Sequence, residues 1–401
     1  MTGSTDAAHV FLLAGEPSGD IIGARLMDAL RRRQGFEAVT FSGVGGPRMG
    51  QQGLDSLFPM DELSLMGFAE VLPHIPRLLR RLSQARREIA ASRPDMVLTI
   101  DSPSFSLRLQ QRLAGLGPKR VHYVAPQVWA WRKGRAAKLG MKIDHLLALL
   151  PFEPPIFRRH GLDCSFVGHP IIEEAGRKGD GGRFRRRYEL PDDAPILCLL
   201  PGSRRHEIQM HMPVLEATVT SLWRRFPRLR LIMPTLPSLA PRLREMVENW
   251  PLVPLILDER ADRFDAYAAS MLAIAASGTV TLELALANLP HVTIYRTGSI
   301  TGWLARRMVQ VEHVNLVNLI LNRPAVPELL LEDCIPDRVA GSAMPLIEDQ
   351  SLRQEQKIAL DGVCSMLGGD GSALPSDQAA DCVINLLGRS EHSRSVLGKV
   401  D

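Results

Sequence analysis

A carboxylate and an arginine each follow a short apolar run, and these two residues could do acid–base and phosphate chemistry. Asp101 comes directly after Met96–Ile100, so we expect its carboxylate at the carboxyl end of a strand, where it could take a proton from a hydroxyl nucleophile. A helix N-cap is the alternative role for this residue. Arg204 ends the turn Pro201–Arg204 after another apolar run. Its fixed charge and bidentate guanidinium suit a departing pyrophosphate.

A second turn of small residues, Ala275–Thr279, opens a predicted helix over Val280–Asn288. Backbone N–H groups and the helix dipole favour phosphate at such a position. Glu283 lies one turn into this helix on the same face as Thr279, and its carboxylate could accept both hydroxyls of a ribose. Each motif alone is equally typical of a capped turn, but the two together indicate a nucleotide site.

Polar residues also follow two strands of the first half. The turn Ala14–Asp20 is rich in small residues, and Ser18 or Asp20 could cap the next helix. The turn lacks G-x-G-x-x-G spacing, which disfavours a dinucleotide site. His122 ends another strand and precedes a segment that contains Gln127, Trp129, Trp131 and Arg132. Burial explains the tryptophans but not this grouping of His, Gln and Arg.

We expect no metal and no cofactor. His206 and His211 mimic a zinc-protease helix, but they are five residues apart and diverge by about 140° on a regular helix. The chain has no Asp-x-Asp pair, the usual metal–diphosphate holder of one class of sugar transferases. Its five scattered cysteines argue against a disulfide framework and for a reducing compartment.

The elements that must position these residues alternate along the chain. Short apolar runs alternate with segments of helical period, which predicts parallel sheets covered by helices on both faces. The expected strands are His9–Ala14, Ala38–Gly43, Met96–Ile100, Arg120–Val124, His145–Leu149, Ser165–Val167, Ile196–Leu200, Leu229–Met233, Val253–Leu257, Leu272–Ala275 and His291–Tyr295. Ligands of such sheets bind beyond the carboxyl ends of the strands.

The predicted fold is α/β, with two doubly wound Rossmann-like domains that face a cleft. We expect the first domain over 1–185, the second over 186–365, a C-terminal helical segment over 366–387 and a flexible tail over 388–401. The expected junction is Glu173–Asp193, which is rich in Gly and charge. The helices after Asp333 could return to the first domain or exchange between subunits.

Composition restricts the function further. With 401 residues, 45% hydrophobic and 23% charged, the chain has the composition of a globular protein. Aromatics at 5% and a net charge of +4 disfavour a nucleic-acid binder. No basic region precedes the first apolar run, and no stretch reaches the ~18 apolar residues of a membrane-spanning helix. We therefore expect a cytoplasmic protein that can touch a membrane surface.

The segment Leu63–Ile89 has two interpretations. It begins with an apolar stretch that includes Met66, Phe68, Val71 and Leu72. In the predicted helix that follows, apolar residues share one face and arginines the other; the arginines are Arg77, Arg80, Arg81 and Arg87. The segment is either a core helix with a solvated face or an interfacial patch for anionic lipid.

Taken together, the ordered motifs closely resemble the lipid-A-disaccharide synthase family of bacterial glycosyltransferases over roughly residues 8–385. The motifs that carry the resemblance are Gly15–Asp20, Met66–Phe68, Ile100–Pro103, His122–Arg132, Leu150–Glu153, Gly168–Pro170, Leu200–Arg204, Ala276–Thr279, Glu283 and Asn315–Asn318. The sequence departs from the family at Leu331, where Gln is common, and at Pro17, where Ala is commoner.

The resemblance implies a metal-free GT-B enzyme that joins UDP-2,3-diacylglucosamine to 2,3-diacylglucosamine 1-phosphate. The products would be a β-1,6-linked disaccharide 1-phosphate and UDP, formed with inversion. Asp101 would be the base and Arg204 the leaving-group clamp. Substrate contacts would come from Glu16, Ser18, Gly19, Asp20, His122 and Gln127, and UDP contacts from Gly202, Ser203, Arg204, Ser277, Gly278, Thr279, Glu283 and Asn318.

The patch Met66, Phe68, Val71, Leu72, Arg77, Arg80 and Arg81 would hold the enzyme peripherally on the inner face of the cytoplasmic membrane. A homodimer is compatible with the sequence. The alternatives are a UDP-sugar 2-epimerase, which would not need the apolar segment, and a membrane-surface scaffold, which would leave the polar turns unexplained.

Overall fold

The computed structural model describes residues 7–63, 74–126, 134–174, 179–259, 262–298, 312–369, 371 and 373–397. It divides into two compact units. The first takes in the chain up to Pro170 and from Gly371 onward, and the second is Ile171–Asp370.

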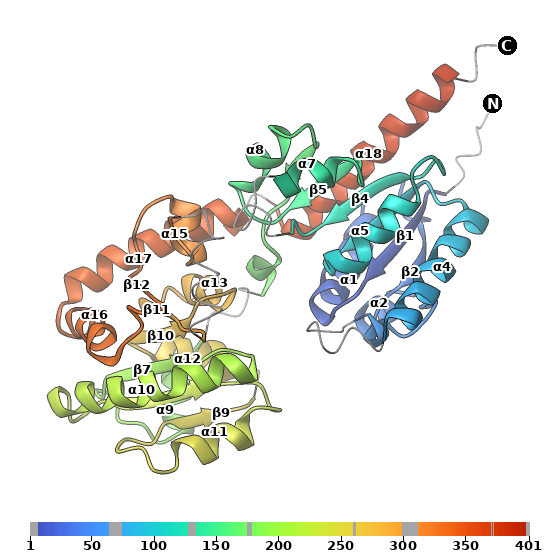
Figure 1. Ribbon diagram of the computed structural model, residues 1–401. Helices are drawn as coiled ribbons and strands as arrows, with labels where there is room; N and C mark the ends of the chain where they lie inside the picture. The colour runs from blue at the N-terminus through green and yellow to red at the C-terminus, as the bar shows by residue number, and fades with distance from the viewer. Residues whose placement is uncertain are drawn as a thin grey trace. The chain divides into compact units, whose positions relative to one another are not determined.

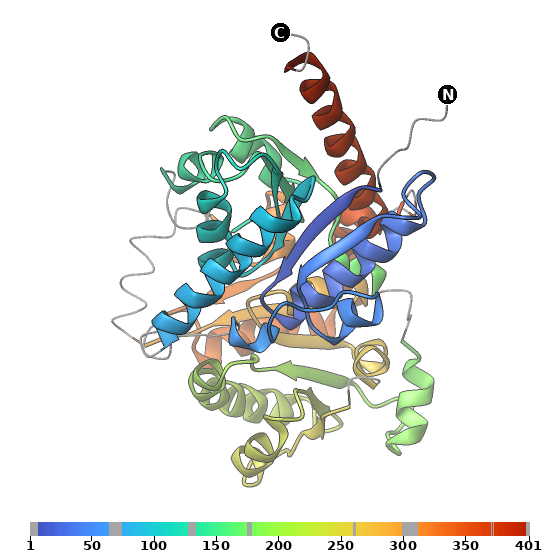
Figure 2. The same ribbon diagram turned by 90° about the vertical axis from the view of Figure 1, so that its right-hand side faces the viewer.

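The first unit is a six-stranded parallel sheet in the order β2-β1-β3-β4-β5-β6, with helices on both faces (Figures 1 and 2). Its strands are β1 His9–Ala14, β2 Thr40–Val44, β3 Met96–Ile100, β4 Lys119–Tyr123, β5 His145–Ala148 and β6 Cys164–Phe166. Its helices include α1 Pro17–Arg31, α2 Pro47–Gln51, α4 Ile75–Ser92, α5 Pro103–Arg112, α7 Gly134–Gly140 and α8 Glu153–Arg158. The central strands form because their apolar residues are buried on both faces, as in β3, where all five are buried.

The second unit repeats this plan in the order β12-β11-β10-β7-β8-β9. Its strands are β7 Ile196–Leu200, β8 Arg230–Pro234, β9 Leu255–Leu257, β10 Leu272–Ala276, β11 His291–Tyr295 and β12 Glu328–Leu330. Its helices are α9 Gly181–Arg187, α10 Arg205–Arg225, α11 Ala240–Val247, α12 Arg263–Ala269, α13 Val280–Leu286, α15 Leu316–Leu321, α16 Pro336–Glu348 and α17 Gln350–Cys364. The predicted α/β class with two doubly wound sheets is confirmed, and β12 is a strand that the sequence analysis missed.

The C-terminal helix α18, Pro375–Leu397, belongs to the first unit and lies beside α1 (Figures 1 and 2). Arg33, two residues after the end of α1, forms ion pairs with Asp377 at 3.1 Å and with Asp381 at 2.6 Å. Ala380 and Val383 are buried in the core of that unit. Helix α18 is therefore part of the first unit and not the separate C-terminal segment that we expected. It also continues beyond Gly388, where we expected a flexible tail.

The expected junction also differs from the structure. Its residues include α9, which is held against α12 by ion pairs of Arg183 with Asp265 at 2.6 Å and of Arg187 with Asp262 at 2.7 Å. Low apolar content suggested a linker, but these charges are partners within the second unit. The boundary consequently falls at Pro170 rather than at 185.

Candidate active site

Four polar side chains at the ends of β1 and β3 form a cluster, which we call the β3-end cluster: Glu16, Ser18, Asp101 and Ser102. The Ser102 N–H donates to Asp101 Oδ1 at 2.8 Å, and Ser102 Oγ donates to Glu16 Oε1 at 3.3 Å. The Ser18 side chain hydrogen-bonds to the Asp101 carboxylate. Because Ala14 of β1 pairs with Ile100 of β3, both strands end at the same level and bring these side chains together.

The backbone of this cluster is held in an unusual conformation. Asp101 and Ser102 have φ values of 53° and 43°, which are uncommon for residues other than glycine. The Asp101 N–H bonds to Tyr123 O at 3.0 Å, and its carbonyl accepts from Ser106 Oγ at 2.8 Å. Gly15 permits the close approach of the two strand ends, since a Cβ there would lie 2.4 Å from Ser102 Oγ.

Burial raises the pKa of the Asp101 carboxyl, while hydrogen bonds from the Ser102 N–H and the Ser18 side chain act to lower it. Ser102, not Asp101, occupies the N-cap position of α5. The capping alternative for Asp101 therefore does not hold. A partly desolvated carboxylate at a strand end is a suitable general base.

Two other residues predicted to contact substrate support the scaffold instead. Asp20 is buried, and its carboxylate accepts the backbone N–H groups of Gly46, Arg48 and Met49 at 2.8–2.9 Å, at the start of α2. Gly19 is buried in α1, where a Cβ would approach the Ile100 carbonyl at 3.4 Å. These two residues thus fix the turn on which Glu16 and Ser18 lie.

His122 is fully buried in β4, one residue pair below the end of the sheet. Its Nδ1 lies 2.8 Å from Thr99 Oγ1, and burial lowers the pKa of its imidazole to about 4. Among the residues described, no hydrogen-bond partner faces its Nε2. The side chain is therefore neutral and lies beneath the cluster. Gln127 lies outside the described residues.

In the second unit, the turn between β7 and α10 is held by Glu207, a residue that the sequence analysis missed. Its Oε2 accepts the N–H groups of Ser203 at 3.3 Å and Arg204 at 3.4 Å, and its Oε1 lies 3.2 Å from Arg204 Nη1. A glutamate three residues after an N-cap is the signal of a capping box, and it could have identified this role.

Two properties of this turn follow. Gly202 must be glycine, because its φ is 116° and a Cβ would lie 2.6 Å from Glu207 Oε2. The Ser203 and Arg204 amides already have an acceptor, so they are not free for phosphate. The turn presents instead the Arg204 guanidinium, whose side chain is 71% exposed.

The neighbouring turn after β10 leaves its backbone accessible. The Ser277 N–H bonds to Ile294 O at 2.9 Å, and Ser277 Oγ donates to Val314 O at 3.3 Å. Gly278 has φ 152°, and a Cβ there would meet nothing within 4 Å. Thr279 occupies the N-cap of α13 without a side-chain cap. A ligand could therefore approach the backbone closely at Gly278.

Glu283 lies one turn into α13, and its carboxylate has partners that the sequence analysis missed. Oε1 forms an ion pair with Arg263 at 3.1 Å, and Oε2 accepts from the Tyr267 hydroxyl at 3.2 Å. Burial raises the pKa of Tyr267 well above its ordinary value, so that the hydroxyl stays protonated and donates. The Glu283 side chain keeps 16% of its surface exposed.

Asn318 departs from the predicted contact with UDP. It is buried, and its Oδ1 accepts the N–H groups of Ala325 and Val326 at 2.9 and 2.8 Å. Its Nδ2 donates to Glu328 Oε1 at 2.6 Å. The amide therefore holds the loop that leads into β12.

The candidate membrane patch is described in part. Met66, Phe68, Val71 and Leu72 lie outside the described residues. In α4, Leu82, Ala85 and Ile89 are buried in the core, whereas Ile75 and Leu79 are 40% and 45% exposed. The helix therefore packs with its second half and exposes apolar residues in its first.

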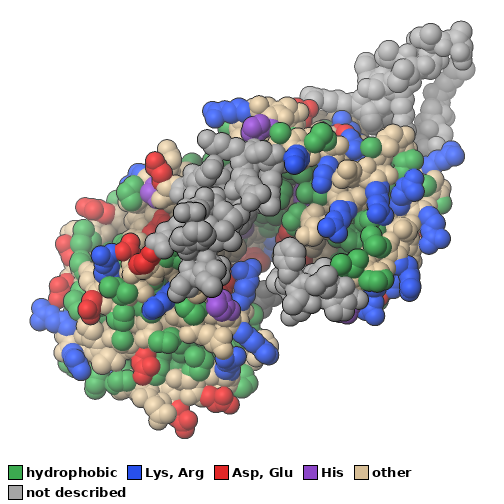
Figure 3. Space-filling model, in the orientation of Figure 1, with side chains coloured by type: hydrophobic (Ala, Val, Ile, Leu, Met, Phe, Trp, Pro, Cys, Tyr) green, Lys and Arg blue, Asp and Glu red, His purple; other side chains and the backbone are tan. Residues whose placement is uncertain are grey.

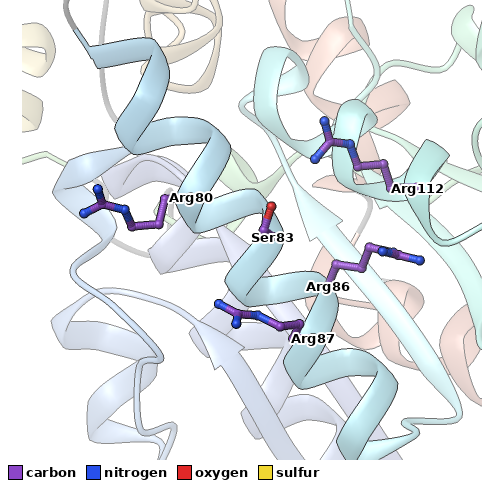
Figure 4. Close-up of a pocket in the computed structure, with 5 residues that line it drawn as sticks. All are labelled: Arg80, Ser83, Arg86, Arg87 and Arg112. Atoms are coloured by element: carbon purple, nitrogen blue, oxygen red, sulfur yellow. The ribbon is translucent and has the colours of Figure 1, made fainter.

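Of the predicted basic residues, Arg77 and Arg80 are exposed, but Arg81 is bound to Glu62 at 2.7 Å. A pocket of about 770 Å³ lies along α4 and α5 and is lined by Arg80, Ser83, Arg86, Arg87 and Arg112 (Figure 4). Figure 3 shows Lys and Arg side chains gathered over these helices. Across the described part of the chain, no helix has the length and hydropathy to span a membrane.

The sequence matches the family model described as lipid-A-disaccharide synthetase over residues 10–373. The lipid-A-disaccharide synthase of Rhodospirillum centenum is 50% identical over 382 residues, which cover 94% of each chain. That of Gluconobacter oxydans is 44% identical over 388 residues, which cover 96% of this chain and 93% of the relative.

Solved structures share the fold at low identity. The UDP-GlcNAc 2-epimerase of Neisseria meningitidis bound to UDP-GlcNAc has a TM-score of 0.62 at 11% identity, covering 95% of this chain and all of that one. MurG of Acinetobacter baumannii has a TM-score of 0.55 at 13% identity, covering 96% and 100%. The fold thus includes epimerases and does not separate the alternatives, but the sequence match does. The chain belongs to the lipid-A-disaccharide synthetase family and is a glycosyltransferase of the two-domain GT-B fold.

Proposed function

We propose that this chain joins UDP-2,3-diacylglucosamine to 2,3-diacylglucosamine 1-phosphate by a single inverting displacement. The donor is α-linked and the product β-linked, so the acceptor 6-hydroxyl attacks the anomeric carbon as the bond to UDP breaks. This reaction needs a base for the hydroxyl proton and a cation for the departing UDP. The observation that carries the proposal is the Asp101 carboxylate, partly buried at a strand end on left-handed backbone.

Asp101 accepts the proton of the acceptor hydroxyl. Burial favours the protonated product of that transfer, because it raises the pKa of the carboxyl. The Ser102 N–H fixes one carboxylate oxygen at 2.8 Å. Glu16 accepts from Ser102 Oγ, and we assign it a positioning role toward Asp101.

Arg204 meets the negative charge that grows on UDP as the bond breaks. Glu207 holds the guanidinium at the turn without enclosing it. The open backbone at Gly278 admits the diphosphate, and Glu283 accepts the ribose hydroxyls. The shared fold of an epimerase bound to UDP-GlcNAc supports a UDP-sugar donor.

The remaining predicted residues have different roles in this proposal. Four of them are buried and support the two sites: Gly19, Asp20, His122 and Asn318. We assign Gln127 the substrate-contacting role that the family resemblance implies. Ser203, Ser277 and Thr279 line the two turns of the donor site.

We also place the enzyme peripherally on the inner face of the cytoplasmic membrane, where acylated substrates lie. The exposed Ile75 and Leu79 and the arginines of the α4–α5 pocket support this placement. Anionic lipid attracts each such arginine with about 1 kcal/mol, and salt weakens the attraction.

The test is a transfer assay with purified protein. UDP release from the diacylated donor should require the diacylated acceptor 1-phosphate, and NMR of the product should show a β anomer. UDP release without acceptor, or formation of a 2-epimer, would contradict the proposal.

A further inference from the structure

His211 of α10 is fully buried beside the donor site and has two hydrogen-bond partners from different segments. Its Nδ1 lies 2.7 Å from the carbonyl oxygen of Pro201, in the turn after β7. Its Nε2 accepts the backbone N–H of Arg296, the residue after β11, at 2.9 Å. The imidazole thus links two loops that are far apart in the sequence, at Pro201 and at Arg296.

The sheet order gives this link its significance. β7 and β11 are the two neighbours of β10, so the ends that His211 joins flank the turn Ser277–Thr279. The edge of the Tyr295 ring lies against the imidazole, with 6.2 Å between ring centres. The same face of α10 carries Glu207, which holds the amides of the Pro201–Arg204 turn.

We infer that His211 is a positioning residue that ties the Pro201–Arg204 turn to the end of β11 and so sets the width of the UDP site. The inference rests on the proposed donor site. Together, Glu207 and His211 fix the turn from its amide side and its carbonyl side, and Arg204 is presented from a turn that cannot shift away from Gly278.

Only one protonation state satisfies both partners. The Pro201 carbonyl needs a donor, so Nδ1 carries the proton, and the Arg296 N–H needs an acceptor, so Nε2 keeps its lone pair. A neutral Nδ1–H imidazole does both. Burial lowers the pKa of His211 and keeps this neutral form.

Three variants separate the two bonds. His211→Leu removes both, His211→Asn keeps a donor near the Nδ1 position, and His211→Gln keeps an acceptor near the Nε2 position. We expect UDP to bind about tenfold more weakly to His211→Leu and to recover in part in the two isosteres, the scale that loss of buried hydrogen bonds gives. The donor KM should rise while the acceptor KM stays unchanged.

Hydrogen exchange at the Arg296 amide reports the bond directly. Exchange should be slow in the wild type and in His211→Gln and faster in His211→Asn and His211→Leu. Thr218→Val is the matched control, because Thr218 is buried two turns along the same helix and donates to Pro336 O at 3.4 Å. This variant should change neither UDP affinity nor Arg296 exchange.

Wild-type UDP affinity in both isosteres would overturn the inference, whether or not His211→Leu folds. The inference would also be overturned if ¹⁵N NMR of the wild-type His211 imidazole showed the proton on Nε2. Arg204→Ala, measured alongside, distinguishes the two proposals. If Arg204→Ala keeps full UDP affinity, the donor site itself is misplaced; if Arg204→Ala weakens binding but the His211 variants do not, only the role of His211 fails.

Discussion

The β3-end cluster of the first unit and the Pro201–Arg204 turn of the second both follow a buried parallel strand, yet they present opposite charges in different surroundings. Asp101 is partly buried, on left-handed backbone, with hydroxyl and amide donors around its carboxylate. Arg204 is mostly exposed and has one carboxylate partner. The same strand–turn–helix plan therefore serves two electrostatic needs.

The difference agrees with the roles that we propose for the two groups. A base gains from burial, which raises its pKa toward that of its task. A leaving-group clamp must instead keep a fixed charge available to a ligand with a diphosphate, and the arginine stays charged in any surroundings. The Asp101 carboxylate is accordingly partly buried, and the Arg204 guanidinium is exposed.

The largest effect is expected at Asp101 of the β3-end cluster. Asp101→Asn should lower turnover by ~10²–10⁴, the usual contribution of general acid–base catalysis. Asn tolerates the left-handed backbone at φ 53°. Because burial raises the pKa of Asp101, its ionised form opposes folding above that pKa. The melting temperature at neutral pH should therefore stay equal or rise.

Asp95→Asn is the matched control. Asp95 lies just before the same strand, at its other end, and accepts the His9 N–H at 2.9 Å. Its replacement should leave turnover nearly unchanged. Similar losses in the two variants would remove Asp101 from the base role.

The next largest effect is expected for Arg204→Ala in the Pro201–Arg204 turn. Loss of the cation should lower kcat by about 10², since electrostatic stabilisation of developing charge is of that order, and should also weaken UDP binding. Steady-state kinetics check this expectation, with the adjacent exposed Arg205→Ala as control. An unchanged kcat in Arg204→Ala would contradict the role as leaving-group clamp.

The membrane surface should respond more weakly. Arg80→Gln combined with Arg87→Gln should reduce binding to anionic vesicles by up to about tenfold at low salt, less at high salt. Sedimentation measures the bound fraction. Arg224→Gln with Arg323→Gln removes the same charge from exposed residues of the second unit and should have little effect. Equal effects of the two pairs would argue for a nonspecific charge effect.

Glu283→Gln should raise the donor KM several-fold with little change in kcat, because the ribose is held equally before and during reaction. Gln keeps an acceptor for the Tyr267 hydroxyl, so the fold should persist. Glu245→Gln, at an exposed position of α11, is the control. A fall in kcat without a change in donor KM would contradict a ribose contact.

The smallest expected effect is a shift in the pH profile when a hydrogen-bond partner of Asp101 is removed. The carboxylate must be ionised to accept a proton, so activity rises with pH through its pKa. Ser18 acts to lower that pKa, and Ser18→Ala should therefore move the acid limb of kcat/KM to higher pH. A shift to lower pH would show that Ser18 does not bond to the ionised form.

Sequence pattern was sufficient where a segment is buried on both faces. Met96–Ile100 and Ile196–Leu200 are continuous apolar runs, and both strands have the predicted bounds. β12 was missed because it is three residues long and exists by pairing with β11. Its first residue, Glu328, is charged, whereas the equally short edge strand β9 lies within the longer run Val253–Leu257 and was predicted.

Site roles were harder to predict when the partner is distant in sequence. Asp20 lies in a polar turn beside the other candidates, but its carboxylate accepts backbone N–H groups of residues 26–29 positions away. His211 was considered only with His206 as a possible metal pair, since its partner Arg296 comes near only when β11 folds. Composition and spacing reveal which residues can react, whereas burial and long-range partners decide which of them do.

The central claim is that Asp101 acts as the base while Arg204 contacts UDP. Calorimetric titration of UDP into Asp101→Asn and Arg204→Ala tests this claim directly. Asp101→Asn should bind UDP with the wild-type Kd although its turnover is lost, and Arg204→Ala should bind it about tenfold or more weakly, as expected for a lost charge-assisted contact. If Asp101→Asn loses UDP affinity as much as Arg204→Ala does, then base and leaving-group chemistry are not separated as we describe.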